Sequence, residues 1–147
     1  MLSIAFYTAK PTELYEKVVD IVAGNPTHCE LVFSDGACFS SSNRDGGCRF
    51  KHIDIDPAHW TLTPLEGLGV DEQKVRNFCI MQQGKGYDWI GVFFGLWSGA
   101  DDPRRWFCSE VCMAALKAGG LDLGLVPVKT TPKKLMECLS GQKKIAQ

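Results

Sequence analysis

The sequence predicts a single domain of the mixed α+β class. Patterns typical of strands fill the first half of the chain, and patterns typical of helices fill the second half. A length of 147 residues suits one domain and is enough to bury a hydrophobic core. No linker, internal repeat or low-complexity segment divides the sequence. We therefore expect one domain over residues 1–147, with a small antiparallel sheet packed on a helix.

Five short segments of the first half have the apolar alternation typical of strands. The expected strands are Leu2–Ala9, His28–Phe33, Ala37–Ser41, Cys48–Asp54 and Trp60–Thr63. Ser34-Asp35-Gly36 and Asn43–Gly47 are turn signals between them. A helix is expected over Thr12–Ala23, where Gly24 would end an apolar stripe.

Helical periodicity dominates the second half of the chain. The expected helices are Val70–Gln83, the short apolar segment Tyr87–Trp97, Phe107–Ala118, and a last helix to about Leu139. Glycines follow the first and third of these helices, and Thr131-Pro132 is a typical N-cap and first-turn pair for the last one.

The segment THCELVFSDGACFSSS, residues 27–42, fixes its own strand register. A three-residue loop with Gly36 in a left-handed conformation pairs Phe33 with Ala37 and places Leu31 opposite Phe39. This register separates an apolar face from a polar face, which a two-residue loop would mix. The polar face carries His28, Glu30, Ser40 and Ser42, so Ser40 or Glu30 could orient the imidazole of His28.

The segment RRWFCSEVCMAAL, residues 104–116, places Cys108 where a helix should begin. The positive end of a helix dipole lowers the pKa of a thiol and favours the nucleophilic thiolate. A structural interpretation is also open, because free cysteine is among the most buried residue types. Cys112, Cys79 and Cys138 fit that structural role, since each lies within an apolar helical pattern.

Composition argues against several other classes of function. The formal net charge is −1, so no basic excess indicates a nucleic-acid partner. No CxxC or HExxH motif supports a metal site, and His52 and His59 are expected at the surface. No cofactor is expected. The N-terminus lacks a signal-peptide pattern and no apolar run is long enough to span a bilayer, so we expect a cytoplasmic protein with reduced thiols and no stable membrane insertion.

The order of these motifs resembles a known superfamily. A strand with the pattern HxELVFxDG is followed about eighty residues later by a helix that opens with FCSEVC. GKGYDWIGVFFG, residues 84–95, and VPVKTTPKKL, residues 126–135, extend the similarity. The chain resembles the circularly permuted papain-like cysteine hydrolases of the NlpC-like superfamily, which include YaeF/YiiX-type and lecithin:retinol acyltransferase-like proteins.

The resemblance implies a cysteine hydrolase or acyltransferase that attacks an amide or ester carbonyl. Cys108 would be the nucleophile, His28 its base, and the third position falls on Ser40, where acyltransferase-like members often have a second His. Glu30 is the alternative orienting residue, and Tyr87 could stabilise an oxyanion. The implied substrates are peptides, amides or acyl lipids, and a phage-encoded protein is one context.

Two further interpretations remain open. The domain could be a papain-like scaffold that binds or assembles with a partner without catalysis, a role that the weak orienting power of a serine at position 40 favours. Five aromatic residues could line an acyl-binding groove, although core packing is their ordinary role. These are Trp89, Phe93, Phe94, Trp97 and Trp106.

Overall fold

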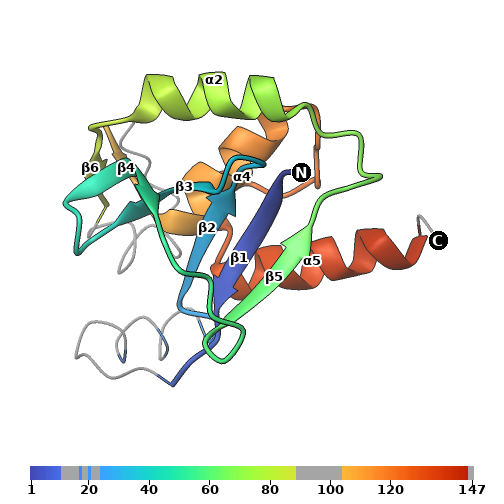
Figure 1. Cartoon of the computed structure of the whole chain (residues 1–147), viewed down its shortest axis with the longest axis horizontal. Helices are drawn as coiled ribbons and strands as arrows, with labels where there is room; N and C mark the ends of the chain where they lie inside the picture. The colour runs from blue at the N-terminus through green and yellow to red at the C-terminus, as the bar shows by residue number, and fades with distance from the viewer. Residues whose placement is uncertain (11–16, 18–19, 21–23, 89–103, 146–147) are drawn as a thin grey trace.

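The computed structural model describes the chain except residues 11–16, 18–19, 21–23, 89–103 and 146–147 (Figure 1). Within the described part, the fold is a mixed α+β domain with one seven-stranded sheet and three α-helices. The strands are β1 (Ser3–Tyr7), β2 (His28–Val32), β3 (Ala37–Ser42), β4 (Gly47–His52), β5 (Trp60–Pro64), β6 (Gly86–Tyr87) and β7 (Arg105–Trp106). The helices are α2 (Glu72–Gln82), α4 (Cys108–Ala118) and α5 (Pro132–Ile145), with a short 3₁₀ turn, η2 (Pro127–Lys129).

The sheet has the strand order β5-β1-β2-β3-β4-β6-β7. All neighbouring strands are antiparallel except β6 and β7, which are parallel. The sheet curls back on itself. This is shown by a hydrogen bond of 2.7 Å that the Ser41 hydroxyl on β3 donates to the Trp106 carbonyl on β7, although β4 and β6 lie between these two strands in the sheet order. This curl brings the end of the sheet close to the start of α4, which follows β7 directly.

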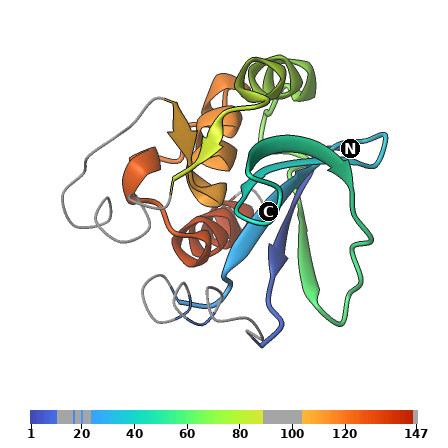
Figure 2. The same cartoon turned by 90° about the vertical axis from the view of Figure 1, so that its left-hand side faces the viewer.

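The helices lie on one side of the sheet, and α4 packs against it (Figure 2). α4 is almost wholly buried, since its apolar face contacts the sheet and its other sides contact α2, η2 and α5. The hydrophobic core between α4 and the sheet includes Ile4, Phe6, Leu31, Phe39, Val111, Met113 and Leu116. Burial of this apolar surface is the main stabilising contribution to the fold.

The predicted register of the β2–β3 hairpin is confirmed. Leu31 pairs with Phe39, and the Phe33 backbone N–H donates to the Ala37 carbonyl at 2.9 Å. Gly36 has a φ of 83°, the left-handed conformation that the three-residue loop requires. The register puts His28 and Glu30 on one face of β2 and Cys29 and Leu31 on the other.

Local signals also fix the helix ends. The Asp71 side chain caps α2 by accepting the Lys74 N–H at 3.1 Å, and Thr131 caps α5 in the same way through Lys134. Gly119, which ends α4, allows a close approach to α2: a Cβ at this position would lie 2.5 Å from Cγ2 of Val75. These contacts set the position of α4, and therefore of Cys108.

Three expectations differ from the structure. Tyr87 lies in strand β6 rather than at the start of a helix, because the backbone of Gly86 is paired with Gly47 on one side and Arg105 on the other. β7 has only two residues, too few to show a strand pattern in the sequence. α5 continues to Ile145, beyond the expected end near Leu139.

Two other expectations concern segments with little or no description. The helix expected over Thr12–Ala23 lies largely outside the described residues, as does the segment from Trp89 to Trp97. Across the parts of the chain that are described, none of the helices combines the length and the apolar character needed to cross a bilayer.

Candidate active site

Cys108 is the first residue of α4. The backbone of Phe107, which precedes it, is extended, with φ −86° and ψ 157°. The Glu110 carboxylate reaches back to accept the Phe107 N–H at 3.1 Å, which holds the chain at the point where it enters the helix. Cys108 therefore lies in the first turn, as the sequence predicted, where the helix dipole favours a negative charge. Only 1% of the residue is exposed.

His28 is the first residue of β2 and contacts the sulfur of Cys108. Its Nε2 lies 2.7 Å from Oε1 of Glu30, two residues further along the same face of the strand. The ring also lies edge-on to Trp60 of β5, with the ring centroids 6.3 Å apart. The strand, the sulfur, the carboxylate and the indole together fix the position of the imidazole.

Glu30 connects the histidine to a half-buried basic residue. Its carboxylate accepts two hydrogen bonds from the Arg49 guanidinium on β4, at 2.8 and 2.7 Å. Arg49 also donates through Nε to Asp45 at 2.7 Å. A planar guanidinium suits this bidentate contact, which fixes both oxygens of Glu30. The result is a continuous polar chain of Cys108, His28, Glu30, Arg49 and Asp45.

The electrostatics of this chain favour charge separation between Cys108 and His28. Burial alone would lower the pKa of His28, but the Cys108 sulfur and then Glu30 outweigh it and raise that pKa to about 10. Burial alone would raise the pKa of the Cys108 thiol, but hydrogen bonds from Cys29 and the charge of His28 lower it to about 5. The pKa of Glu30 is held below its ordinary value, because hydrogen bonds from His28 and Arg49 outweigh the effect of burial. Near neutral pH, the structure thus favours a thiolate paired with an imidazolium.

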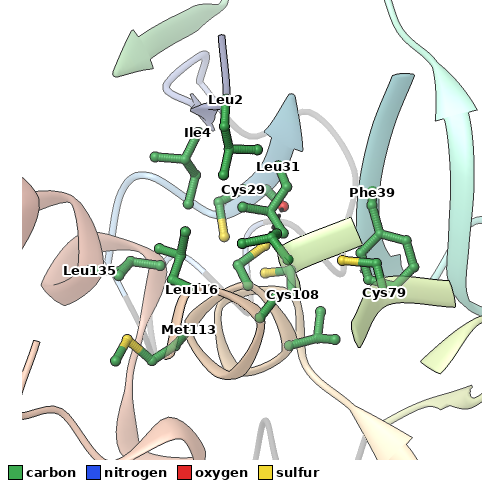
Figure 3. Close-up of a cluster of buried hydrophobic side chains, with 14 of the residues drawn as sticks. Leu2, Ile4, Cys29, Leu31, Phe39, Cys79, Cys108, Met113, Leu116 and Leu135 are labelled. Carbon is green, nitrogen blue, oxygen red and sulfur yellow. Dashed lines mark hydrogen bonds between the residues drawn. The ribbon is translucent and has the colours of Figure 1, made fainter. Parts of the chain in front are cut away.

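Cys29 completes the surroundings of the sulfur. Its side chain and its backbone both help to lower the pKa of the Cys108 thiol. It also lies next to Cys112, whose thiol is 3.9 Å from the Cys29 carbonyl oxygen. In the close-up, Cys29 on its strand and Cys108 on the helix both face the layer between sheet and helix (Figure 3).

A cavity of about 260 Å³ opens beside His28 and Glu30. Aromatic side chains line part of it, and charged side chains line the rest. The lining residues used below are Tyr7, His28, Glu30, Arg49, Trp60 and Tyr87. Cys108 is not in the lining, so the cavity reaches the reactive pair on the His28 side.

The structure distinguishes between the two orienting residues proposed from the sequence. The Ser40 hydroxyl donates to the Ser41 carbonyl at 3.5 Å, whereas His28 is bound by Glu30. Ser40 is fully buried and pairs across the strands with Arg49, so it lies beside the residue that binds Glu30. Tyr87 lies on the cavity wall with its ring edge-on to Phe107, at a centroid distance of 6.0 Å.

The other histidines lie apart from the Cys108 sulfur. His52 lies on the cavity wall and His59 is paired with Asp56 at 3.2 Å; both residues are exposed. All seven cysteines are free thiols. Among the residues that the structure describes, no group of three or more His, Cys, Asp or Glu side chains could hold a metal ion.

Most of the proposed aromatic groove lies outside the described residues, namely Trp89, Phe93, Phe94 and Trp97. Trp106 is described and does not line the cavity. Its Nε1 donates to the side chain of Gln82 at 3.2 Å, and its ring lies edge-on to Phe78 of α2. Trp106 therefore packs against α2, which is the core role that is ordinary for tryptophan.

Sequence reasoning missed two contributors to the site. Arg49 could have been found by extending the hairpin register through the predicted turn to β4, which places it opposite Ser40 and beside Glu30. Cys29 gave no such signal, because its contact with Cys108 depends on how α4 packs on β2. No family model matches the chain, and comparisons with curated proteins and with solved structures gave no significant match. The function must therefore be argued from the site.

Proposed function

We propose that this protein is a cysteine hydrolase or acyltransferase with a permuted papain-like arrangement, in which His28 precedes Cys108 in the chain. The observation that carries the proposal is the position of His28, which contacts the Cys108 sulfur and the Glu30 carboxylate at the same time. A nucleophile, a base and a group that orients the base are the three parts that nucleophilic catalysis requires. The Cys108-bearing helix packed on a curled sheet also agrees with the resemblance seen in the sequence.

The proposed mechanism begins with the thiolate form of Cys108. The sulfur attacks the carbonyl carbon of an amide or ester, and the imidazolium of His28 then protonates the leaving group. Because Glu30 binds Nε2, Nδ1 is the ring nitrogen left to exchange this proton. His28 then activates water, or another acyl acceptor, to resolve the thioester. Backbone amides of the first turn of α4 and the Tyr87 hydroxyl are the proposed oxyanion donors.

Glu30 takes the orienting role in this proposal, in place of Ser40. A carboxylate that contacts the imidazole keeps the ring in position and stabilises the imidazolium that follows proton uptake. Arg49 and Asp45 hold Glu30 in turn, so the orientation of His28 depends on β4 as well as on β2. The cavity beside His28 has room for a small acyl or amino-acid-sized group.

A second candidate function is favoured by the burial of the sulfur. A residue that is 1% exposed can hold a structural thiolate that no substrate reaches. In that case the domain would be a papain-like scaffold used for binding or assembly, and the buried ion pair would serve only to define the packing of α4 on β2.

Acyl transfer to the protein from p-nitrophenyl acetate would separate the two functions. We expect a burst of p-nitrophenol and acetylation of Cys108, identified by peptide mass spectrometry. Cys108→Ser should abolish the burst while leaving the fold intact. Cys112→Ser is the matched control, because it removes a buried thiol one helical turn away and should keep the burst. Acetylation of other cysteines only, or none, would favour the scaffold.

A further inference from the structure

The sulfur of Cys108 has a second thiol as its direct neighbour. Cys29 extends from β2 toward α4, and its side chain interacts with the Cys108 thiol and lowers the pKa of that thiol (Figure 3). Both residues are buried, at 0% and 1% exposure, and belong to the same core cluster. Because one lies on a strand and the other on a facing helix, their side chains approach from opposite sides of the same layer (Figure 3).

Cys112 is close to the same group but is badly placed to bond with Cys108. The two residues are one turn apart on α4, so their side chains point the same way rather than toward each other. A disulfide requires Cβ atoms that face one another at short distance. Cys29 instead faces Cys108 across the interface between strand and helix, and its side chain lowers the pKa of the Cys108 thiol (Figure 3).

We propose that Cys108 and Cys29 form a reversible disulfide when the protein meets hydrogen peroxide, with Cys29 as the resolving thiol. In the first step the Cys108 thiolate attacks one oxygen of the peroxide, and the O–O bond breaks. Cys108 becomes a sulfenic acid, and the leaving hydroxide takes the proton of the His28 imidazolium to form water.

In the second step the Cys29 sulfur attacks the sulfenic sulfur of Cys108 and the new S–S bond forms. The S–O bond breaks, and the departing hydroxide takes the thiol proton of Cys29 and leaves as a second water. Overall, two thiol sulfurs lose two electrons, which reduce one peroxide to two waters. No reactant besides peroxide is needed.

The charge on Cys108 would determine when Cys29 can ionise and carry out this second step. Burial, together with the interactions of the Cys29 thiol with Cys108 and Cys112, raises the pKa of Cys29 well above its ordinary value. Loss of the negative charge on Cys108 after oxidation removes part of that cause. Cys29 would therefore ionise more readily once its neighbour has become a sulfenic acid, and the disulfide would protect Cys108 from irreversible oxidation.

This inference rests on the thiolate of the proposed function, but it does not require turnover of any substrate. The test treats the full-length protein with increasing hydrogen peroxide, blocks the remaining thiols and maps the digested peptides without reduction. We expect a peptide that links Cys29 to Cys108, and full recovery of free Cys108 after reduction. In Cys29→Ser, recovery should fall by roughly tenfold, because Cys108 continues to sulfinic acid. Cys112→Ser is the matched control and should keep the link.

A Cys29–Cys108 link in the wild-type protein supports the inference even if Cys29→Ser does not fold. Sulfinic acid on Cys108 without the link, or a link between Cys29 and Cys112 instead, overturns it. The pH dependence of Cys108 alkylation separates the two proposals. A low alkylation midpoint without the link removes the inference alone. An ordinary midpoint without the link removes the thiolate on which both depend.

Discussion

Two groups of buried thiols lie at α4. In the first group the surroundings of Cys108 lower its pKa, whereas in the second group, Cys48 and Cys79, the surroundings raise the pKa of both thiols. At the first turn of α4, Cys108 lies against His28 and Cys29. Further along the interface, Cys48 on β4 and Cys79 on α2 are also buried, at 3% and 0% exposure. Burial raises the pKa of Cys48 to about 11, and it also raises the pKa of Cys79. In contrast, the pKa of Cys108 is lowered to about 5.

This difference in pKa shows that burial without a charged partner favours the unreactive, protonated thiol. A dry environment disfavours the thiolate in both regions. What distinguishes Cys108 is its interaction with the basic ring of His28 and with Cys29, and its position at the start of a helix. His28 in turn keeps its proton because Glu30 and Arg49 hold a negative charge beside it. Substitutions that remove these groups one at a time should have progressively smaller effects.

Removal of the base should make Cys108 resemble the second group. In His28→Ala, the midpoint of the pH profile of Cys108 alkylation by iodoacetamide should rise from about 5 to the ordinary value of 9.0 or above. Peptide mass spectrometry at a series of pH values measures this midpoint for each cysteine. His52→Ala is the matched control, since this histidine lines the same cavity at its exposed rim. A midpoint that stays near 5 without His28 would contradict the ion pair.

Glu30→Gln keeps the shape of the side chain and removes its charge. Breaking this buried contact with Arg49 should lower the free energy of unfolding by about 3 kcal/mol, measured with urea at neutral pH. The midpoint of Cys108 alkylation should also rise, because His28 then holds its proton less firmly. Asp45→Asn is the control, because it removes the outer contact of Arg49 and leaves the contact between Glu30 and His28.

Glu30→Gln should also change the way in which the free energy of unfolding depends on pH. The folded-state pKa of Glu30 is below its ordinary value of 4.5, so its charge stabilises the fold above that pH. This stabilisation is lost as the pH falls below 4.5 through the folded-state pKa. Wild-type stability should therefore decline more steeply on acidification than that of Glu30→Gln. Equal slopes would mean that Glu30 is not a stabilising anion.

Cys112→Ser tests whether a buried thiol near the reactive one matters to reactivity. The hydroxyl is more costly to bury than the thiol, so the free energy of unfolding should fall by about 1–2 kcal/mol. The midpoint of Cys108 alkylation should stay near 5 in the folded protein. If the low-midpoint thiol disappeared in Cys112→Ser but persisted in Cys108→Ser, the reactive cysteine would be Cys112 and not Cys108.

Ser40→Ala should have the smallest effect. Its hydroxyl makes one long hydrogen bond of 3.5 Å to the Ser41 carbonyl, so loss of that bond should cost less than about 1 kcal/mol. The alkylation midpoint of Cys108 should shift by less than about half a pH unit, because Glu30 remains on His28. A shift as large as that of Glu30→Gln would restore Ser40 as the orienting residue.

Local patterns in the sequence determined much of the fold. The alternation in residues 27–42 and the need for φ > 0 at Gly36 fixed a hairpin register that places His28 and Glu30 on one face. Cap residues fixed the starts of α2 and α5, and Cys108 could be placed at the first turn of a helix. These features depend on neighbours in the chain, so the residues themselves specify them.

The surroundings of the Cys108 sulfur depend on tertiary packing. The sequence favoured Ser40 as the residue that orients His28, with Glu30 as the alternative, whereas in the structure Glu30 contacts the imidazole. The proximity of Cys29 to Cys108 and the strand β7 also arise from packing, since their partners lie far apart in the sequence. A helix start and a strand face are set by residues close in the chain. The charge of a buried thiol is set by groups that only the folded sheet and helix bring together.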